Sequence, residues 1–148
     1  MVADDMGYGD FGLYSEGRVH TPALDELASQ GIRFTQHYAG SAVCSPSRAA
    51  LLTGRYPIRT GAVTPQEVLG NDRIALDEST IADSFKAAGY ATGMVGKWHN
   101  GALDPRFHPN ARGFDEFAGF SGGWADYYKW NLDRNGTFEK SDGRYLTD

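Results

Sequence analysis

The chain has 148 residues, of which 41% are hydrophobic and 22% are charged, and it carries a formal net charge of −5. This composition predicts one globular domain over residues 1–148. No basic stripe stands out in the sequence, so nothing in it indicates a nucleic-acid partner. A single cysteine excludes a disulfide framework, and no apolar run approaches the ~20 residues that a transmembrane segment requires.

The N-terminal run Val2–Asp10 predicts the end of a buried strand that leads into a glycine-rich loop. Asp4 and Asp5 would then lie at the carboxyl end of a strand, where α/β folds place ligands. Paired carboxylates suit a hard cation such as Ca²⁺ or Mg²⁺, and an acidic turn is the alternative. Asp10 is either a further ligand or a residue that shapes the loop.

A helix is predicted over 22–30, with Thr21 as its cap, Pro22 in its first turn and Gly31 at its end. An apolar stripe along this helix predicts a face that packs on a core. The alternation in Ile32–Tyr38 then predicts a strand.

The stretch Cys44–Arg55 reads Cys-Ser-Pro-Ser-Arg-Ala-Ala-Leu-Leu-Thr-Gly-Arg and contains the only cysteine. Ser45 is placed to cap a helix, and Pro46 fits a first helical turn. Gly54 is a natural residue to end that helix. The pattern therefore predicts a helix that begins at or just after Cys44.

Cys44 is a candidate for chemistry because the dipole at a helix start favours negative charge. Arg48 follows four residues later and therefore shares its helix face. A cysteine-phosphatase loop is excluded, because such a loop has arginine six residues after the cysteine and this chain has Ala50 there. The alternative is that Cys44 is a small buried apolar residue.

A further helix and a further strand precede the next polar cluster. Thr80 and Asp83 form a capping-box pattern for a helix that Gly89 ends, and the apolar run Tyr90–Val95 predicts a buried strand. The cluster itself is Gly-Lys-Trp-His-Asn-Gly over Gly96–Gly101.

In that cluster Lys97 and His99 are two residues apart, so an extended backbone would point both to the same side. The alternative is an ordinary strand end that meets solvent. Further along, a glycine-rich stretch contains four aromatic residues: Trp124, Tyr127, Tyr128 and Trp130. They are suited either to stacking on a sugar or aryl ring or to packing at the edge of the core.

Three stretches resemble the motifs of the type I sulfatases. Cys44–Arg55 is similar to the family signature, whose Cys-x-Pro-x-Arg core is read by an enzyme that oxidises the cysteine to formylglycine. Ala3–Asp10 resembles the metal loop of the family, and Gly96–Gly101 resembles its Gly-Lys-Trp-His-Leu-Gly motif, with Asn100 in place of leucine. The motifs occur in the family order.

The resemblance implies an α/β fold with an alkaline-phosphatase-like parallel or mixed sheet flanked by helices. It also implies that residues 1–148 are the N-terminal part of a sulfatase catalytic domain, truncated at both ends. The full-length protein is then expected to be exported (periplasmic, secreted or lysosomal), although no signal peptide is visible in this chain. We expect the isolated chain to be inactive.

The implied activity is hydrolysis of sulfate monoesters. The resemblance makes Cys44, as formylglycine, the nucleophile, and makes Asp4, Asp5 and the modified Cys44 ligands of a Ca²⁺ ion in preference to Mg²⁺. The implied partners are a sulfated small molecule or glycan and, during maturation, the formylglycine-generating enzyme.

The same resemblance assigns roles to four further side chains. Arg48 would hold the aldehyde hydrate, Lys97 would clamp hydroxyl and sulfate, and His99 would take the proton that expels sulfate. Lys97 and Trp124 are also expected to bind substrate.

Three other functions stay open from the sequence. The first is a phosphonate or phosphodiester hydrolase of the same superfamily. The second is an unmodified domain that only binds anions. The third is a non-catalytic carbohydrate-binding fragment that uses the aromatic residues of 124–130.

Overall fold

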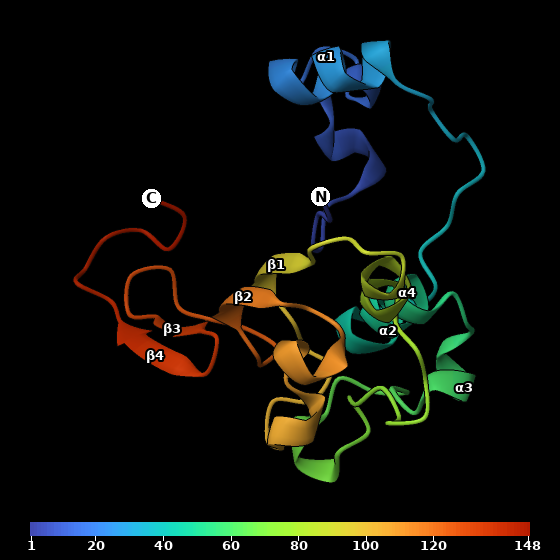
Figure 1. Cartoon of the computed structure of the whole chain (residues 1–148). Helices are drawn as coiled ribbons and strands as arrows, with labels where there is room; N and C mark the ends of the chain where they lie inside the picture. Colours follow the sequence, from blue (N-terminus) through green and yellow to red (C-terminus); the bar gives the residue numbers. More distant parts are fainter. The chain divides into compact units, whose positions relative to one another are not determined.

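The computed structural model describes all residues of the chain, which divides into two compact units, Met1–Tyr38 and Ala39–Asp148. The elements of the first unit are η1 (Tyr8–Asp10), η2 (Gly12–Tyr14) and α1 (Pro22–Gln30), drawn in shades of blue in Figure 1. The helix predicted over 22–30 is therefore confirmed.

Thr21 precedes α1 but does not cap it with its side chain. Its hydroxyl instead accepts the backbone N–H of Gly12 at 2.8 Å and donates to Asp25 Oδ1 at 3.1 Å. The same Asp25 oxygen accepts the backbone N–H of Leu13 at 3.0 Å. These bonds tie η2 to the first turn of α1.

The apolar stripe on α1 lines an open groove rather than a closed core. No residue of α1 is buried, and Leu27 is exposed. The groove has a volume of about 520 Å³, and its lining includes Phe11, Ile32 and Phe34. A unit as short as this one has too little chain to enclose a core.

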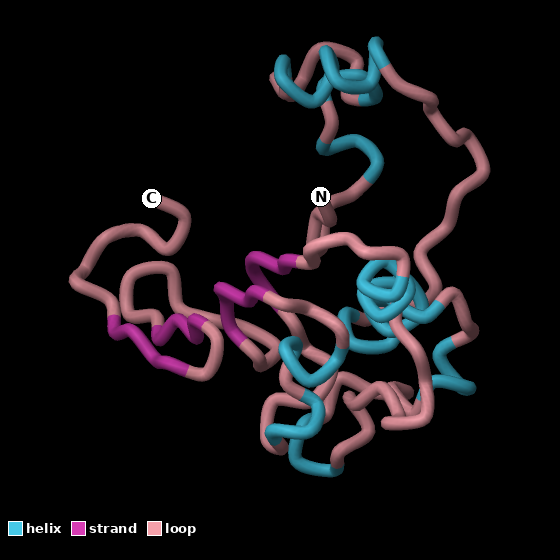
Figure 2. The backbone as a smooth tube through the Cα atoms, viewed as in Figure 1, coloured by secondary structure: helices cyan, strands magenta, loops and turns pink.

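Two strands expected in the first unit do not form. Met1–Ala3 has no regular structure, and Ile32–Tyr38 contains only a turn, so both predictions are wrong. Figure 2 shows the segment after α1 as loop. A strand is stable only when a neighbouring strand pairs its N–H and C=O groups, and the first unit offers neither segment such a neighbour.

The second unit combines helices with a four-stranded sheet of order β1-β2-β3-β4. Its elements are α2 (Cys44–Thr53), α3 (Pro57–Thr60), η3 (Glu67–Leu69), α4 (Ile81–Ala87), β1 (Gly93–Lys97), η4 (Pro105–Phe107), η5 (Pro109–Arg112), β2 (Glu116–Phe120), β3 (Asn131–Arg134) and β4 (Thr137–Lys140). Strands β1 and β2 run parallel, whereas β2 with β3 and β3 with β4 run antiparallel. This mixed sheet with its helices confirms the predicted α/β class.

The capping box predicted at α4 forms. The Thr80 N–H donates to Asp83 Oδ2 at 2.8 Å, and the Asp83 N–H donates to Thr80 Oγ1 at 3.2 Å. The next strand begins at Gly93 rather than at Tyr90. Tyr90 folds back on α4 instead, because its N–H donates to the Phe85 carbonyl oxygen at 3.0 Å and the two rings meet edge to face.

The core of the second unit draws on α2, the loops and the sheet. Its buried members are Ala49, Ala62, Ile74, Trp98 and Phe117. Trp98 follows β1 directly, and its Nε1–H donates to the carbonyl oxygen of Phe107 at 2.9 Å. The chain immediately after β1 is therefore anchored in the core, which fixes the residues on either side of Trp98.

Arg112 is a buried residue that hydrogen-bonds to the backbone of the loop at 74–78. It is 4% exposed and donates to the carbonyl oxygens of Ile74, Ala75 and Glu78 at 3.4, 3.0 and 2.8 Å. Burial lowers the pKa of Arg112, but a guanidinium stays charged in proteins. Backbone carbonyl groups therefore solvate the buried guanidinium, and the same carbonyl groups have Arg112 as their donor.

Replacing Arg112 with alanine is expected to lower the free energy of unfolding by about 2–4 kcal/mol, because one buried and two partly buried carbonyl groups lose their donor. Urea denaturation followed by circular dichroism measures this change. Arg106→Ala is the matched control, because Arg106 is exposed and pairs with Asp104 at the surface. An equal shift of the midpoint in both variants would contradict the prediction.

Candidate active site

Helix α2 places Cys44 as its first residue, with Val43 as the N-cap. Cys44 is half-buried and its thiol is free. Ser45 does not cap the helix, contrary to the prediction, because its Oγ–H donates to the carbonyl oxygen of Asp72 at 2.9 Å. Gly54 ends the helix as predicted, in the left-handed conformation with φ 68°.

Arg48 joins the cysteine helix to the carboxyl end of β1. Its Nη1 donates to the carbonyl oxygen of Lys97, the last residue of that strand, at 2.6 Å. Buried Asp72 makes a second link, because its carbonyl accepts Ser45 and its Oδ2 accepts the N–H of Gly101 at 3.1 Å. Two of the three sequence motifs are thus held together within the second unit.

His99 does not continue the extended backbone of β1. The strand ends at Lys97, and His99 has φ 52°, in the left-handed region that few residues other than glycine adopt. Lys97 and His99 therefore do not share one side of an extended strand, and that prediction is wrong. The N–H of His99 still donates to the carbonyl oxygen of Ser121 at 3.0 Å, which keeps the backbone beside the end of β2.

The hydrogen bonds of His99 assign its tautomer. Its ring is buried, and Nε2 lies 3.1 Å from the carbonyl oxygen of Pro65. A carbonyl can only accept, so Nε2 carries the hydrogen and Nδ1 is the acceptor of the neutral ring. Nδ1 is buried without a hydrogen-bond partner. The side chain therefore presents one basic nitrogen that no protein donor occupies.

Burial is the main cause of a lowered pKa at His99, and the charge of Lys97 acts in the same direction. The hydrogen bond to Pro65 and the carboxylate of Glu67 act in the opposite direction. The ring is consequently neutral near physiological pH, which is the form that can accept a proton.

This lowered pKa predicts a pH-dependent loss of stability. The pKa of His99 in the folded state lies below the unfolded value of 6.5, so the unfolded chain binds more protons in acid. The stability contributed by neutral His99 is complete above pH 6.5 and is lost as the pH falls below it. Urea midpoints across this range should therefore fall less steeply in His99→Gln than in the wild type.

His20→Gln is the control for that measurement, because His20 is an exposed residue of the first unit. The control should keep the pH dependence of the wild type. If His99→Gln also kept it, the buried neutral ring would not contribute to the acid response.

Asp4 and Asp5 lie in the first unit, in an exposed loop where Asp5 has φ 57°. Their carboxylate oxygens have the donor chemistry that Ca²⁺ requires, but two residues would provide only part of the roughly six to eight ligands. Neither unit by itself contains a group of three or more His, Cys, Asp or Glu side chains placed to hold a metal ion. Asp10 shapes the loop, because its Oδ2 accepts the N–H of Gly7 at 2.8 Å.

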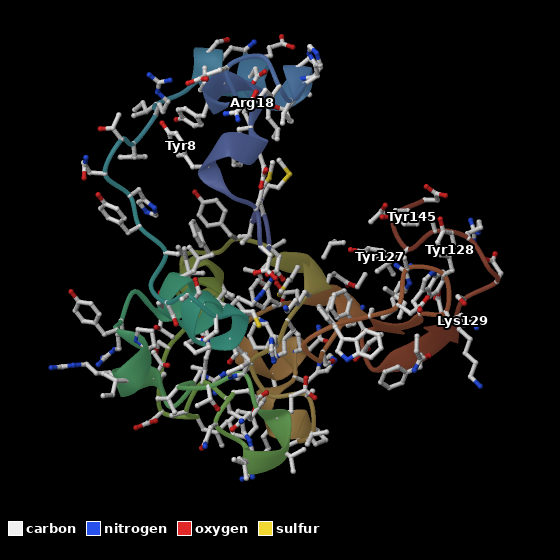
Figure 3. The ribbon with its side chains drawn as sticks, turned by 180° about the vertical axis from the view of Figure 1, so that it is seen from behind. Tyr8, Arg18, Tyr127, Tyr128, Lys129 and Tyr145 are labelled. Atoms are coloured by element: carbon white, nitrogen blue, oxygen red, sulfur yellow. The ribbon has the colours of Figure 1, made fainter.

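Trp124 and the tyrosines that follow it are exposed rather than part of the core. Trp124 is 80% exposed. Tyr127 stacks on Tyr145 with ring centroids 5.3 Å apart, and Tyr128 meets Tyr145 edge to face at 5.4 Å. Figure 3 shows these three tyrosines gathered in the C-terminal part of the chain. The alternative that Tyr127 and Tyr128 pack at the edge of the core is therefore wrong.

Sequence reasoning did not single out Glu67 or Asp72. Glu67 Oε1 lies 3.8 Å from His99 Nε2, and Asp72 bonds to both linked motifs. Glu67 begins the short helix η3 and Asp72 lies in a loop, and neither has periodicity or a motif around it. No local signal identifies either residue, because its partners lie tens of residues away in the sequence.

These features define a class of α/β protein. A helix that begins with cysteine is hydrogen-bonded to the carboxyl end of a sheet strand, and a lysine and a histidine lie at and just after that strand end. The family model described as Sulfatase matches residues 1–148, and the chain belongs to the sulfatase family.

Curated relatives agree with this assignment. N-acetylgalactosamine-6-sulfatase of Sus scrofa is 49% identical over 129 residues, which cover 80% of this chain and 24% of that protein. Arylsulfatase H of Canis lupus familiaris is 44% identical over 131 residues, which cover 80% of this chain and 23% of that protein. The chain thus spans about a quarter of the length of these relatives.

Solved structures show the same fold. The crystal structure of Ps i-CgsB superimposes with a TM-score of 0.90 at 35% identity, covering 100% of this chain and 38% of that one. The structure of Ps i-CgsB in complex with k-i-k-neocarrahexaose gives a TM-score of 0.88 at 34% identity, covering 99% and 37%. The likeness confirms the predicted alkaline-phosphatase-like fold. No helix of the chain has the length and apolar character needed to cross a bilayer.

Proposed function

We propose that the protein hydrolyses sulfate monoesters and that Cys44, converted to formylglycine, is its reactive residue. The observation that carries the proposal is the 2.6 Å hydrogen bond from Arg48 to the carbonyl oxygen of Lys97. This bond ties the cysteine helix to Lys97, two residues before His99, and so supports a shared site for these residues. Family membership and the sulfatase relatives support the reaction class.

The side chains of the second unit divide the work by their chemistry. Formylglycine, once hydrated, supplies one hydroxyl that attacks the ester sulfur and releases the alcohol, and a second hydroxyl whose deprotonation expels sulfate and restores the aldehyde. Arg48 orients residue 44 across one helical turn and adds positive charge. Lys97 binds the anionic sulfate and stabilises the charge that develops on it. His99 receives a proton at Nδ1, its unpartnered nitrogen.

We further propose that Asp4 and Asp5 are ligands of Ca²⁺. An exposed loop with carboxylate oxygens suits the flexible coordination of Ca²⁺ better than the strict octahedron of Mg²⁺. When bound, such an ion lowers the pKa of a coordinated hydroxyl and offsets the charge of the sulfate oxygens.

The proposed substrate class is a sulfated glycan, with Trp124 stacking on a sugar ring. Two similarities support it: one relative is named for a sulfated amino sugar, and one structural neighbour was crystallised with a neocarrahexaose. The exposed face of Trp124 is available for such stacking. Export of the protein and maturation by a formylglycine-generating enzyme belong to the same proposal.

The test begins with co-expression of the complete protein and a formylglycine-generating enzyme. Peptide mass spectrometry should show that the sulfur of Cys44 is replaced by oxygen. Sulfate release is then measured from p-nitrophenyl sulfate and a sulfated oligosaccharide, with and without Ca²⁺. Cleavage of a phosphonate or phosphodiester in preference to both sulfate esters, or an unmodified active thiol, would contradict the proposal.

A further inference from the structure

Glu67 lies beside His99 but belongs to none of the three motifs. It is the first residue of η3, and its Oε1 lies 3.8 Å from His99 Nε2. That separation is too long for a hydrogen bond. The same oxygen accepts the backbone N–H of Gly123 at 2.6 Å. Glu67 therefore acts on the position of His99 chiefly through Gly123, whose loop it binds.

Gly122 and Gly123 pack directly against the two side chains. A Cβ atom at Gly123 would lie 2.8 Å from Cε1 and 2.9 Å from Nε2 of His99. A Cβ atom at Gly122 would lie 3.0 Å from Glu67 Oε1. Only glycine allows the backbone to approach this closely. The loop of Gly122 and Gly123 therefore packs tightly against the imidazole, and the hydrogen bond to Glu67 fixes the position of that loop.

His99 depends on such support because its backbone is in a sparsely populated conformation, with φ 52°. The carbonyl oxygen that orients its ring belongs to Pro65, two residues before Glu67. One short segment therefore supplies both the acceptor for Nε2 and the carboxylate that fixes the opposing loop. Moving Glu67 would disturb both contacts together.

We propose that Glu67 is a positioning residue that holds Gly123 against the His99 ring, so that Nε2 stays hydrogen-bonded to the Pro65 carbonyl oxygen and Nδ1 keeps no protein donor. This inference rests on the proposed function, in which Nδ1 receives the proton, and it adds a residue to that site. It requires no contact between Glu67 and substrate.

Three substitutions in the complete protein test the role. Glu67→Ala is expected to lower kcat by about 10–100-fold with little change in KM, because a misplaced base slows the reaction more than binding. Glu67→Gln keeps an oxygen acceptor for Gly123 and should restore most of kcat. Gly123→Ala should reproduce the loss, because its Cβ would displace the ring.

Two controls separate positioning from general damage. Glu139→Ala removes an exposed glutamate of β4, and Gly93→Ala adds a Cβ that meets nothing closer than 3.9 Å. Both should keep the kcat of the wild type. A loss of stability in Glu67→Ala without any change in kcat would overturn the inference and leave Glu67 a structural residue.

A second measurement does not depend on turnover. In protein with ¹⁵N-labelled histidine, the His99 signal is assigned by its loss in His99→Gln. The wild type and Glu67→Gln should show the single Nε2–H tautomer, whereas Glu67→Ala and Gly123→Ala should show mixed tautomers. An unchanged signal would overturn the inference even in an active enzyme. A changed signal in protein that hydrolyses no sulfate ester would support positioning while the proposed function fails.

Discussion

Replacing Cys44 with alanine is expected to lower sulfate-ester turnover by about 10⁴-fold or more, because the substitution removes the residue that we propose as the nucleophile. The fold should survive. Cys44 is a half-buried first residue of α2, and alanine is a good helix former. Sulfate release and circular dichroism on the same preparation measure both expectations.

Cys44→Ser is the matched control, because serine keeps one hydroxyl but cannot supply the pair that formylglycine provides. It should be inactive in repeated turnover, as alanine is. Full multiple turnover by Cys44→Ser would show that an ordinary hydroxyl is sufficient and that conversion of Cys44 is unnecessary.

The second large effect is expected at Arg48. Arg48→Ala should lower kcat/KM by about 10²–10³-fold, because a preorganised cation is lost beside residue 44. The free energy of unfolding should fall by about 1–3 kcal/mol, because the partly buried carbonyl of Lys97 loses a donor. Steady-state kinetics and urea denaturation measure the two losses separately.

Arg48→Lys tests whether charge alone is sufficient. Lysine keeps the positive charge but lacks the planar guanidinium, which can donate hydrogen bonds to two partners at once. Arg48→Lys should therefore recover only part of the activity that Arg48→Ala loses. Arg59→Ala, at the exposed end of α3, is the control and should behave as the wild type. Full activity in Arg48→Ala would remove the argument that joins the two motifs into one site.

The sequence alone determined two helices of the second unit, α2 and α4. The start of α2 at Cys44, its end at Gly54 and the capping box of Thr80 with Asp83 were all predictable. Caps, terminating glycines and first-turn prolines act within one or two helical turns, so their physical cause lies in adjacent residues. The motif residues were found for the same reason, as short contiguous stretches.

Only the tertiary structure decided how those stretches meet. The bond from Arg48 to Lys97 joins residues 49 positions apart, and that from Gly123 to Glu67 joins residues 56 apart. The left-handed backbone of His99 depends on contacts with residues distant in the sequence. Ile32–Tyr38 forms no strand because no distant segment pairs with it. Backbone groups and buried side chains take the conformation that satisfies their hydrogen bonds, and a partner that is remote in sequence leaves no periodic signal.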